Sequence, residues 1–163
     1  MDIAELVDKA INNIKKGKGY LGHGNDGMIY TITDEVVLKL HTGSHLGSPQ
    51  RSAEHEFEVG RELYQKGVQV PRYVGLFRAL PISRQESYGV FMQRIHGQEV
   101  SSLSPALHLE AQRQYQEQKK LIEGLGYVLG SDSKSAYINT LFDPKQRKLF
   151  LFDLVQWKRK PAL

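Results

Sequence analysis

Cysteine is absent from this sequence, tryptophan occurs once, and no long run of apolar residues is present. The lack of cysteine excludes disulfides, thiolate metal sites and a thiol nucleophile, and it suits a reducing cytosol. No stretch approaches the roughly 20 apolar residues of a membrane span, and residues 1–17 lack the basic start and apolar block of a secretory signal. The sequence therefore predicts a soluble, cytoplasmic protein without a membrane partner.

The composition is that of one ordinary globular domain. Of the 163 residues, 40% are apolar and 25% are charged, which allows one apolar core rather than two independent domains. The net charge of +4 fits a nucleic-acid partner, and it fits equally an enzyme that handles polyphosphate. Because basic and aromatic residues do not interleave, we expect no nucleic-acid interface. The six histidines show no spacing typical of a zinc site.

Hydrophobic periodicity and turn residues predict an α+β order of elements. Apolar residues at helical spacing indicate a helix over 3–14, and alternation indicates strands over 28–33 and 36–40 that continue a short strand from Tyr20. A loop rich in Gly, Ser and Pro covers 41–52. The remaining expected elements are a helix over 53–66, strands over 73–80 and 88–95, a helix over 105–125, and a hairpin of strands 138–142 and 149–154.

Three glycines in the segment GHGNDGMIY, at Gly22, Gly24 and Gly27, have the spacing G-x-G-x-x-G. By itself this spacing is weak, and a polar turn between strands explains it equally well. In a dinucleotide-binding fold the glycines join a strand to a helix. Here the following MIYTIT alternates as a strand, so the glycines join two strands. A glycine hairpin that covers phosphates is the arrangement found in protein kinases.

The kinase interpretation requires a lysine on the third strand and a carboxylate to pair with it. VVLKL supplies Lys39 between aliphatic residues, although an edge lysine that faces water remains the alternative. The next helix offers Glu54, Glu56, Glu58 and Glu62. Glu56 is the first choice, because helical periodicity places it beside the apolar Phe57 near the inward boundary, and Glu54 is the second.

With these residues in place, the sequence resembles the protein-kinase-like superfamily, and AEHEFEVGRELYQKGVQVP is especially similar to the corresponding helix and strand of the RIO kinases. The resemblance implies a single minimal kinase domain over 1–163. Its N-lobe, over about 1–95, would be an antiparallel sheet with helix C, and its much reduced C-lobe would cover 96–163.

The same resemblance assigns nucleotide contacts in the N-lobe. YGVFMQRIHG corresponds to the last N-lobe strand and the hinge, with Met92 as gatekeeper and the backbone of Gln93 to Ile95 facing adenine. Ile29, on the strand after the glycines, would line the nucleotide site.

Metal ligands are expected in the second half of the chain. Asp153 ends the alternating strand LFLFDL and stands where kinases have the aspartate of the DFG triplet, although here the triplet reads Asp-Leu-Val without the glycine. NTLFD resembles the kinase motif that carries the second magnesium ligand, which nominates Asn139. ATP and Mg²⁺ are the implied cofactors.

The catalytic base is implied at Asp132, with Lys134 on the transferring phosphate and a two-residue insertion in the catalytic loop. The His-Arg-Asp triplet of kinases is absent. An ungapped match instead places Tyr137 at the asparagine position, and the protein would then be a nucleotide-binding pseudokinase that acts as a binding module.

The resemblance favours a minimal serine/threonine protein kinase. Ten residues follow Asp153, so the sequence is expected to lack an activation loop and a large helical C-lobe, as in minimal effector kinases that bacterial pathogens inject into the host cytosol. One family of those effectors modifies a host heat-shock chaperone, which is therefore the implied protein partner of a monomeric enzyme. The alternative enzyme is a small-molecule or lipopolysaccharide-sugar kinase.

Overall fold

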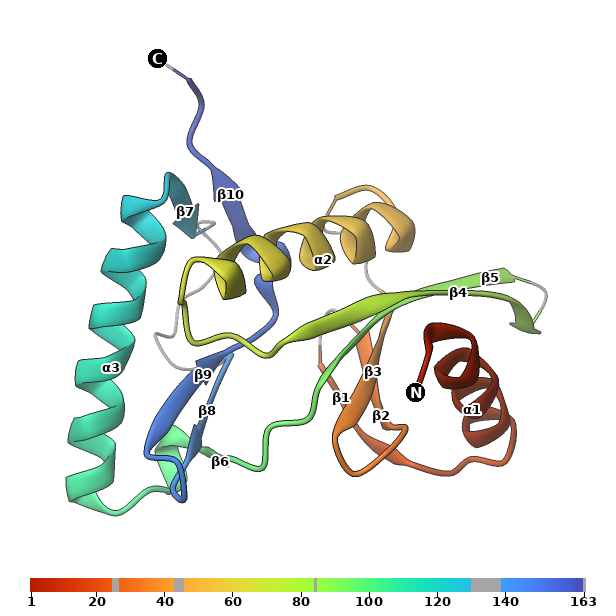
Figure 1. Ribbon diagram of the computed structural model, residues 1–163, viewed down its shortest axis with the longest axis horizontal. Helices are drawn as coiled ribbons and strands as arrows, with labels where there is room; N and C mark the ends of the chain where they lie inside the picture. The colour runs from red at the N-terminus through yellow and green to blue at the C-terminus, as the bar shows by residue number, and fades with distance from the viewer. Residues whose placement is uncertain (25–26, 43–45, 84, 130–138, 163) are drawn as a thin grey trace. The chain divides into compact units, whose positions relative to one another are not determined.

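The computed structural model describes all residues except 25–26, 43–45, 84, 130–138 and 163 (Figure 1). The described chain divides into two compact units. The first comprises Met1–Glu58 and Arg72–Arg94, and the second comprises Val59–Pro71 and Ile95–Leu163. The change at Arg94 lies next to the lobe boundary expected from the sequence, and residues 59–71 group with the second unit rather than with the first.

The first unit is built on a five-stranded antiparallel sheet with the order β1-β2-β3-β5-β4. Its elements in chain order are α1 (Ile3–Lys15), β1 (Tyr20–Gly24), β2 (Gly27–Thr31), β3 (Val36–His41), the first part of α2 (Pro49–Gln65), β4 (Tyr73–Ser83) and β5 (Gln85–Gln93). The rest of α2, from Val59, belongs to the second unit. The expected meander is present, and the glycine segment joins β1 to β2 as MIYTIT predicts. Strand β4 continues to Ser83, beyond the expected end at residue 80, and β5 begins at Gln85, before the expected start at residue 88.

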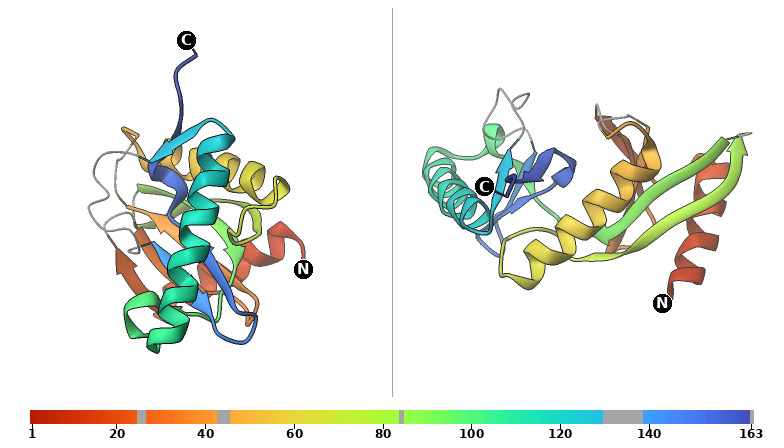
Figure 2. Two further views of the ribbon diagram at one scale, coloured as in Figure 1. Left: turned by 90° about the vertical axis from the view of Figure 1, so that its left-hand side faces the viewer. Right: turned by 90° about the horizontal axis from the view of Figure 1, so that it is seen from above.

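Helix α1 covers one face of this sheet (Figure 2). Asp2 begins the helix with a capping box, in which its carboxylate accepts from the Glu5 amide at 2.8 Å and the Glu5 carboxylate accepts from the Asp2 amide at 3.2 Å. The apolar stripe seen in the sequence then packs into the sheet, where Leu6 and Ala10 are buried beside Phe77. The helix expected over 3–14 is therefore explained by both its cap and its apolar face.

Helix α2 begins at Pro49, earlier than the expected start near Ala53. The stretch GSPQ reads as a loop because Pro and Ser are turn residues, but both also suit a helix start. The Ser48 hydroxyl accepts from the Arg51 amide at 3.2 Å, and proline is tolerated in the first turn because its missing N–H needs no helical partner. The Ser48 cap therefore begins the helix within a stretch whose composition is typical of a loop.

The described residues of the second unit form two small sheets and one long helix. Its elements are β6 (Gln98–Glu99), the 3₁₀ turn η1 (Val100–Ser102), α3 (Pro105–Gly124), β7 (Tyr127–Leu129), β8 (Thr140–Asp143), β9 (Lys148–Leu151), the 3₁₀ turn η2 (Leu154–Gln156) and β10 (Trp157–Arg159). One sheet has the order β6-β8-β9 and the other pairs β10 with β7. The helix expected over 105–125 and the terminal hairpin are present, whereas β6, β7 and β10 are too short to give a sequence pattern.

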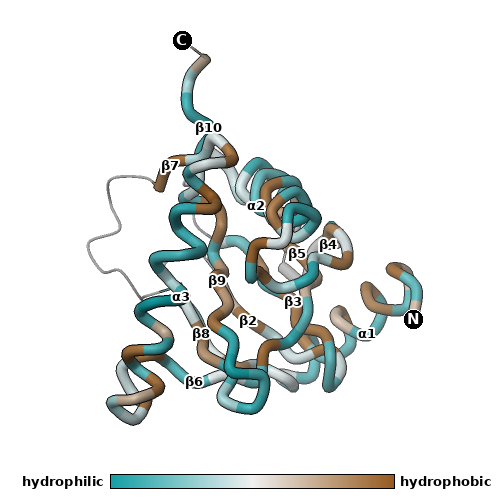
Figure 3. Tube along the Cα trace, turned by 60° about the vertical axis from the view of Figure 1, so that its left-hand side comes forward, coloured by the Kyte–Doolittle hydropathy of each residue, from teal (hydrophilic) through white to brown (hydrophobic). Residues whose placement is uncertain are grey.

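Apolar strands and a mostly polar helix meet in this second unit (Figure 3). Phe142 on β8 and Leu149 on β9 are buried, as are Ala111 and Ile122 on α3. Gln69 explains why residues 59–71 group here: its amide donates to the Gln118 side chain at 2.8 Å, and its carbonyl accepts from the Leu151 amide at 2.9 Å.

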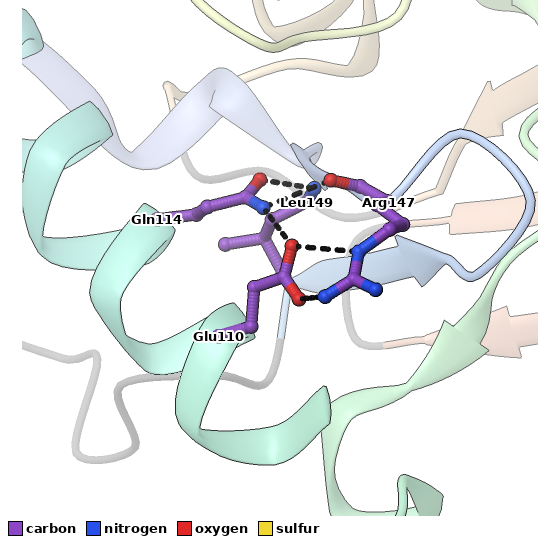
Figure 4. Close-up of polar contacts among 4 residues, drawn as sticks. All are labelled: Glu110, Gln114, Arg147 and Leu149. Atoms are coloured by element: carbon purple, nitrogen blue, oxygen red, sulfur yellow. Dashed lines mark hydrogen bonds and ion pairs between the residues drawn. The ribbon is translucent and has the colours of Figure 1, made fainter. Parts of the chain in front are cut away.

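Gln114 on α3 ties this helix to the β8–β9 hairpin (Figure 4). Its side-chain amide donates to the carbonyl of Arg147 at 2.9 Å and its carbonyl accepts from the amide of Leu149, also at 2.9 Å. Glu110, one turn earlier, binds the Arg147 guanidinium. A buried glutamine that binds both backbone groups fixes the hairpin, most strongly at the buried amide of Leu149, which has no water to replace the lost partner.

Replacing Gln114 with leucine is expected to lower the free energy of unfolding by about 1 to 3 kcal/mol, since the buried Leu149 amide loses its partner and the Arg147 carbonyl loses a partly buried one. Urea unfolding followed by circular dichroism measures the loss. Gln116→Leu is the matched control on the exposed face of the same helix. Equal effects of the two substitutions would contradict this role for Gln114.

None of the helices in the described ranges has the length and apolar character that crossing a membrane requires.

Candidate functional site

A buried ion pair between Lys39 and Glu56 is the central feature of the first unit. Lys39 Nζ lies 2.7 Å from Glu56 Oε2, and the two residues are 5% and 0% exposed. Strand alternation explains the geometry: Leu38 and Leu40 enter the core that α1 covers, so Lys39 between them points to the opposite face. The structure thus joins the predicted lysine to the first-choice glutamate.

The charge state of Glu56 follows from its surroundings. Burial alone would raise the pKa of Glu56, but the ammonium of Lys39 and the neighbouring His41 outweigh it and lower that pKa from 4.5 to about 2. The carboxylate is therefore ionised at neutral pH. A buried charge persists because an opposite charge is held against it.

Two further residues that the sequence analysis did not single out also reach Glu56. The Tyr73 hydroxyl donates to Oε1 at 3.0 Å. His41 Nε2 is buried and lies 3.0 Å from Oε2, an ion-pair distance at which the two atoms do not have hydrogen-bond geometry. His41 could have been found, because it follows Lys39 by two residues on the same strand and so shares its face.

The glycine segment lies on the strands next to Lys39. Gly27 begins β2 opposite His41, and a Cβ at this position would lie 2.0 Å from the carbonyl oxygen of Leu40. Gly27 is therefore required for the close approach of β2 and β3. Gly22 has a φ of +156°, a backbone conformation that residues with side chains disfavour. A Cβ at Gly22 would have open space around it. Gly24 ends β1, and the turn residues 25–26 lie outside the described part of the chain.

Ile29 and Met92 lie on the same face of the sheet as Lys39. Ile29 on β2 is directly opposite Lys39, and residues opposite each other in a ladder project to the same side. Met92 on β5 is opposite Val37, which alternation also places on the Lys39 face, and it is buried. The structure therefore brings these three predicted residues to one surface of the first unit.

The predicted hinge residues follow Met92 at the end of β5. The Gln93 amide donates to the carbonyl of Arg72 and the Arg94 amide donates to the carbonyl of Glu35, each at 2.8 Å. These two amides are already engaged, so an adenine contact from this segment would have to use its carbonyls or the amide of Ile95. Ile95 is the first residue of this segment in the second unit.

Asn139 and Asp153, the predicted metal ligands, are held close together in the second unit. The amide of Phe152 donates to the carbonyl of Asn139 at 3.0 Å, which places the backbone of Asn139 beside the residue before Asp153. Asp153 follows β9 by two residues rather than ending it, and precedes the buried residues Leu154 and Val155 of η2.

Asp153 has a strained backbone. Its φ of 59° and ψ of 52° place it in the left-handed region, which non-glycine residues seldom occupy, although aspartate and asparagine tolerate it best. Such strain is found preferentially where a side chain has to be aimed at a ligand. Together, Asn139 and Asp153 offer side-chain oxygens of the kind that Mg²⁺ prefers when phosphates complete its coordination.

Asp132 and Lys134, predicted as base and phosphate contact, lie outside the described residues, as does Tyr137. Among the residues that are described, no three His, Asp or Glu side chains gather as a metal site.

The chain is similar to known proteins in structure rather than in sequence. The models of known protein families and the curated protein sequences contain no match to this sequence. Among solved structures, a Legionella pneumophila kinase, Lpg2603, bound to IP6, is similar with a TM-score of 0.59 and 16% identity over 91% of this chain and 52% of that one. WbdD is similar with a TM-score of 0.56 and 11% identity over 88% of this chain and 33% of that one.

These similarities show that the chain has a protein-kinase-like fold. A further WbdD structure, described as a bifunctional kinase-methyltransferase, is similar with a TM-score of 0.52 and 13% identity, over 82% of this chain. The chain spans about half the length of the Legionella kinase and about a third of WbdD. At these identities the likeness establishes the α+β fold expected from the sequence, and the chemistry has to be argued from this chain's own residues.

Proposed function

We propose that this protein is a minimal serine/threonine kinase that transfers the γ-phosphoryl group of ATP to a protein hydroxyl. Similarity to kinase structures supports a kinase-like function in general. The observation that carries the proposal further is the buried ion pair between Lys39, on the strand after a glycine hairpin, and Glu56 of α2. A buried lysine held in place by a carboxylate is suited to bind phosphate oxygens, because its position is fixed before the nucleotide arrives.

Within this proposal the first unit binds the nucleotide. Backbone amides of the segment from Gly22 to Gly27 would donate to phosphate oxygens, which can approach closely where no side chain intervenes. Lys39 would neutralise the α- and β-phosphates, and Ile29 with Met92 would contact the nucleoside on the same face of the sheet. Glu56 would hold Lys39 without touching the substrate.

The second unit would carry the transfer step. The acceptor hydroxyl oxygen attacks the γ-phosphorus, its proton passes to Asp132, and the bond from the γ-phosphorus to the bridging oxygen breaks to leave ADP. Asn139 and Asp153 would hold Mg²⁺, which when bound offsets the negative charge that develops on the phosphate oxygens. Lys134 would bind the transferring group. These roles are supported by the resemblance to kinases and by the side-chain oxygens of Asn139 and Asp153, which are suited to bind Mg²⁺.

The direct test incubates the protein with γ-labelled ATP, Mg²⁺ and a host cell lysate, with and without IP6, since the Legionella kinase structure contains that compound. Label in protein bands is expected, and a host heat-shock chaperone is the first acceptor to examine. An Asp153→Asn variant, which should give no label, controls for contaminating kinases. Absence of label with either protein or small-molecule acceptors would favour a nucleotide-binding pseudokinase.

The second candidate is a small-molecule or lipopolysaccharide-sugar kinase, which the RIO-like helix of the sequence also permits. The same incubation separates the two candidates. Label that appears in the small-molecule fraction, and not in protein, would identify the sugar or another small hydroxyl compound as the acceptor. Delivery into a host cell is part of the protein-kinase proposal alone.

A further inference from the structure

We infer that Tyr73 is a positioning residue whose hydroxyl fixes the carboxylate of Glu56 against Lys39. The inference rests on the proposed function, in which Lys39 binds phosphate. It concerns a contact from β4 that neither the glycine motif nor the lysine–glutamate pattern of the sequence indicates.

The two oxygens of Glu56 are held from two different strands. Lys39 on β3 donates to Oε2 at 2.7 Å and Tyr73 on β4 donates to Oε1 at 3.0 Å. A carboxylate bound through one oxygen can still rotate about its terminal bond, and an opposite contact on the second oxygen removes that freedom. Because Glu56 is 0% exposed, water is not at hand to replace either donor.

His41 makes the second contact more important. Its Nε2 lies 3.0 Å from Oε2, the oxygen that Lys39 also contacts, so two basic groups share one side of the carboxylate. Tyr73 serves the other oxygen. Without the hydroxyl, Oε1 would lose this donor, and the carboxylate could turn away from the geometry that holds the Lys39 ammonium.

A β-bulge directs Tyr73 to this site. Tyr73 is opposite Met92 and Gly75 is opposite Phe91, so Val74 is an extra residue in the ladder. Gly75 lies under Ile3 of α1, on the core face, and regular alternation would put Tyr73 on that face as well. Because of this extra residue, the Tyr73 side chain projects from the other face of the sheet, the face of Lys39, where its hydroxyl reaches Glu56.

The experiment compares wild type with Tyr73→Phe, which removes only the hydroxyl. Lys39 is followed by its rate of reaction with an amine-acylating reagent, read site by site by mass spectrometry, and exposed Lys148 is the internal standard. We expect Lys39 to react about tenfold faster in the variant, with Lys148 unchanged, because the lost bond is one to a charged group. With an active preparation, kcat/KM for ATP should fall about tenfold while the KM for the acceptor stays the same.

Two controls separate positioning from general stability. Tyr30→Phe removes the hydroxyl of another buried tyrosine in the same sheet, which contacts Met28 Sδ at 3.8 Å, and it should leave Lys39 labelling unchanged. In a Glu56→Gln background, Tyr73→Phe should add little to the labelling rate, since the pair is already weakened. Thermal unfolding of each variant shows that labelling was measured on folded protein.

The outcomes distinguish this inference from the proposed function. Unchanged Lys39 labelling in folded Tyr73→Phe overturns the positioning role even if wild type is an active kinase. An equal increase of labelling in the presence and absence of the Glu56 carboxylate also overturns it. Faster Lys39 labelling in a protein that transfers no phosphate supports the positioning role and shows that the proposed function fails.

Discussion

Replacing Lys39 with methionine is expected to reduce phosphoryl transfer at least about a hundredfold and to lower the free energy of unfolding by about 3 to 5 kcal/mol. Methionine retains much of the apolar stem but lacks the ammonium that lies 2.7 Å from Glu56 Oε2. The fully buried carboxylate then loses the cation that balances its charge. The ATP assay and urea unfolding at pH 7 measure the two losses separately.

The stability loss should depend on pH in a defined direction. Burial raises the pKa of Glu56, but Lys39 and His41 lower it from 4.5 to about 2, so in wild type the carboxylate contributes stability above about pH 4.5 and loses it as the pH falls toward 2. In Lys39→Met, burial has the larger influence and the folded protein favours the protonated carboxyl. Lowering the pH from 7 to 4 should therefore narrow the difference in unfolding free energy between wild type and variant.

Two variants control this result. Lys148→Met removes an exposed lysine and should change neither the unfolding free energy nor its pH dependence by more than about 0.5 kcal/mol. A Lys39→Met, Glu56→Gln double variant removes both charges, so it should recover part of the stability without recovering activity. A stability difference for Lys39→Met that is the same at pH 7 and pH 4 would contradict the assigned role of Glu56.

The first unit could largely be predicted because its sequence signals are local. The stripe of α1 repeats at helical spacing, and alternation in VVLKL places Lys39 opposite the core face. The choice of Glu56 needed only helical periodicity and the cost of a buried, unpaired ammonium. A pattern that repeats along one element can be read without knowing its partner, which is why these features were accessible.

The contact between Tyr73 and Glu56 could not be predicted, because it depends on how two strands pair and not on a pattern within one strand. The direction of the Tyr73 side chain depends on the bulge at Val74, and a bulge is a property of the pairing between β4 and β5 that alternation in one strand cannot reveal. Strands β6, β7 and β10 were missed because two or three residues are too few to show a period. The early start of α2 was missed because Ser48 and Pro49 serve loops and helix caps alike.

Replacing Asp153 with asparagine is expected to reduce kcat at least about a hundredfold while leaving the thermal unfolding temperature nearly unchanged. Asparagine has the same size and also tolerates the left-handed backbone that Asp153 adopts at a φ of 59°, so the substitution removes a charge without adding strain. Alanine would confound the two effects. Steady-state kinetics with varied Mg²⁺ should show that raising the metal concentration recovers little of the lost rate.

Asp143→Asn is the matched control, at the last residue of β8, which pairs with Lys148 at the start of β9. Asp143 is buried, but its oxygens accept from the Lys145 and Gln146 amides and from the Gln146 side chain, so it fixes the β8–β9 turn. Removing its charge should cost about 1 kcal/mol of stability and change kcat less than about threefold. Because the two aspartates belong to the same unit, opposite outcomes for stability and rate assign turn formation to Asp143 and chemistry to Asp153. Similar losses of rate in both variants would indicate that distortion of the hairpin, and not the loss of a metal ligand, explains the effect at Asp153.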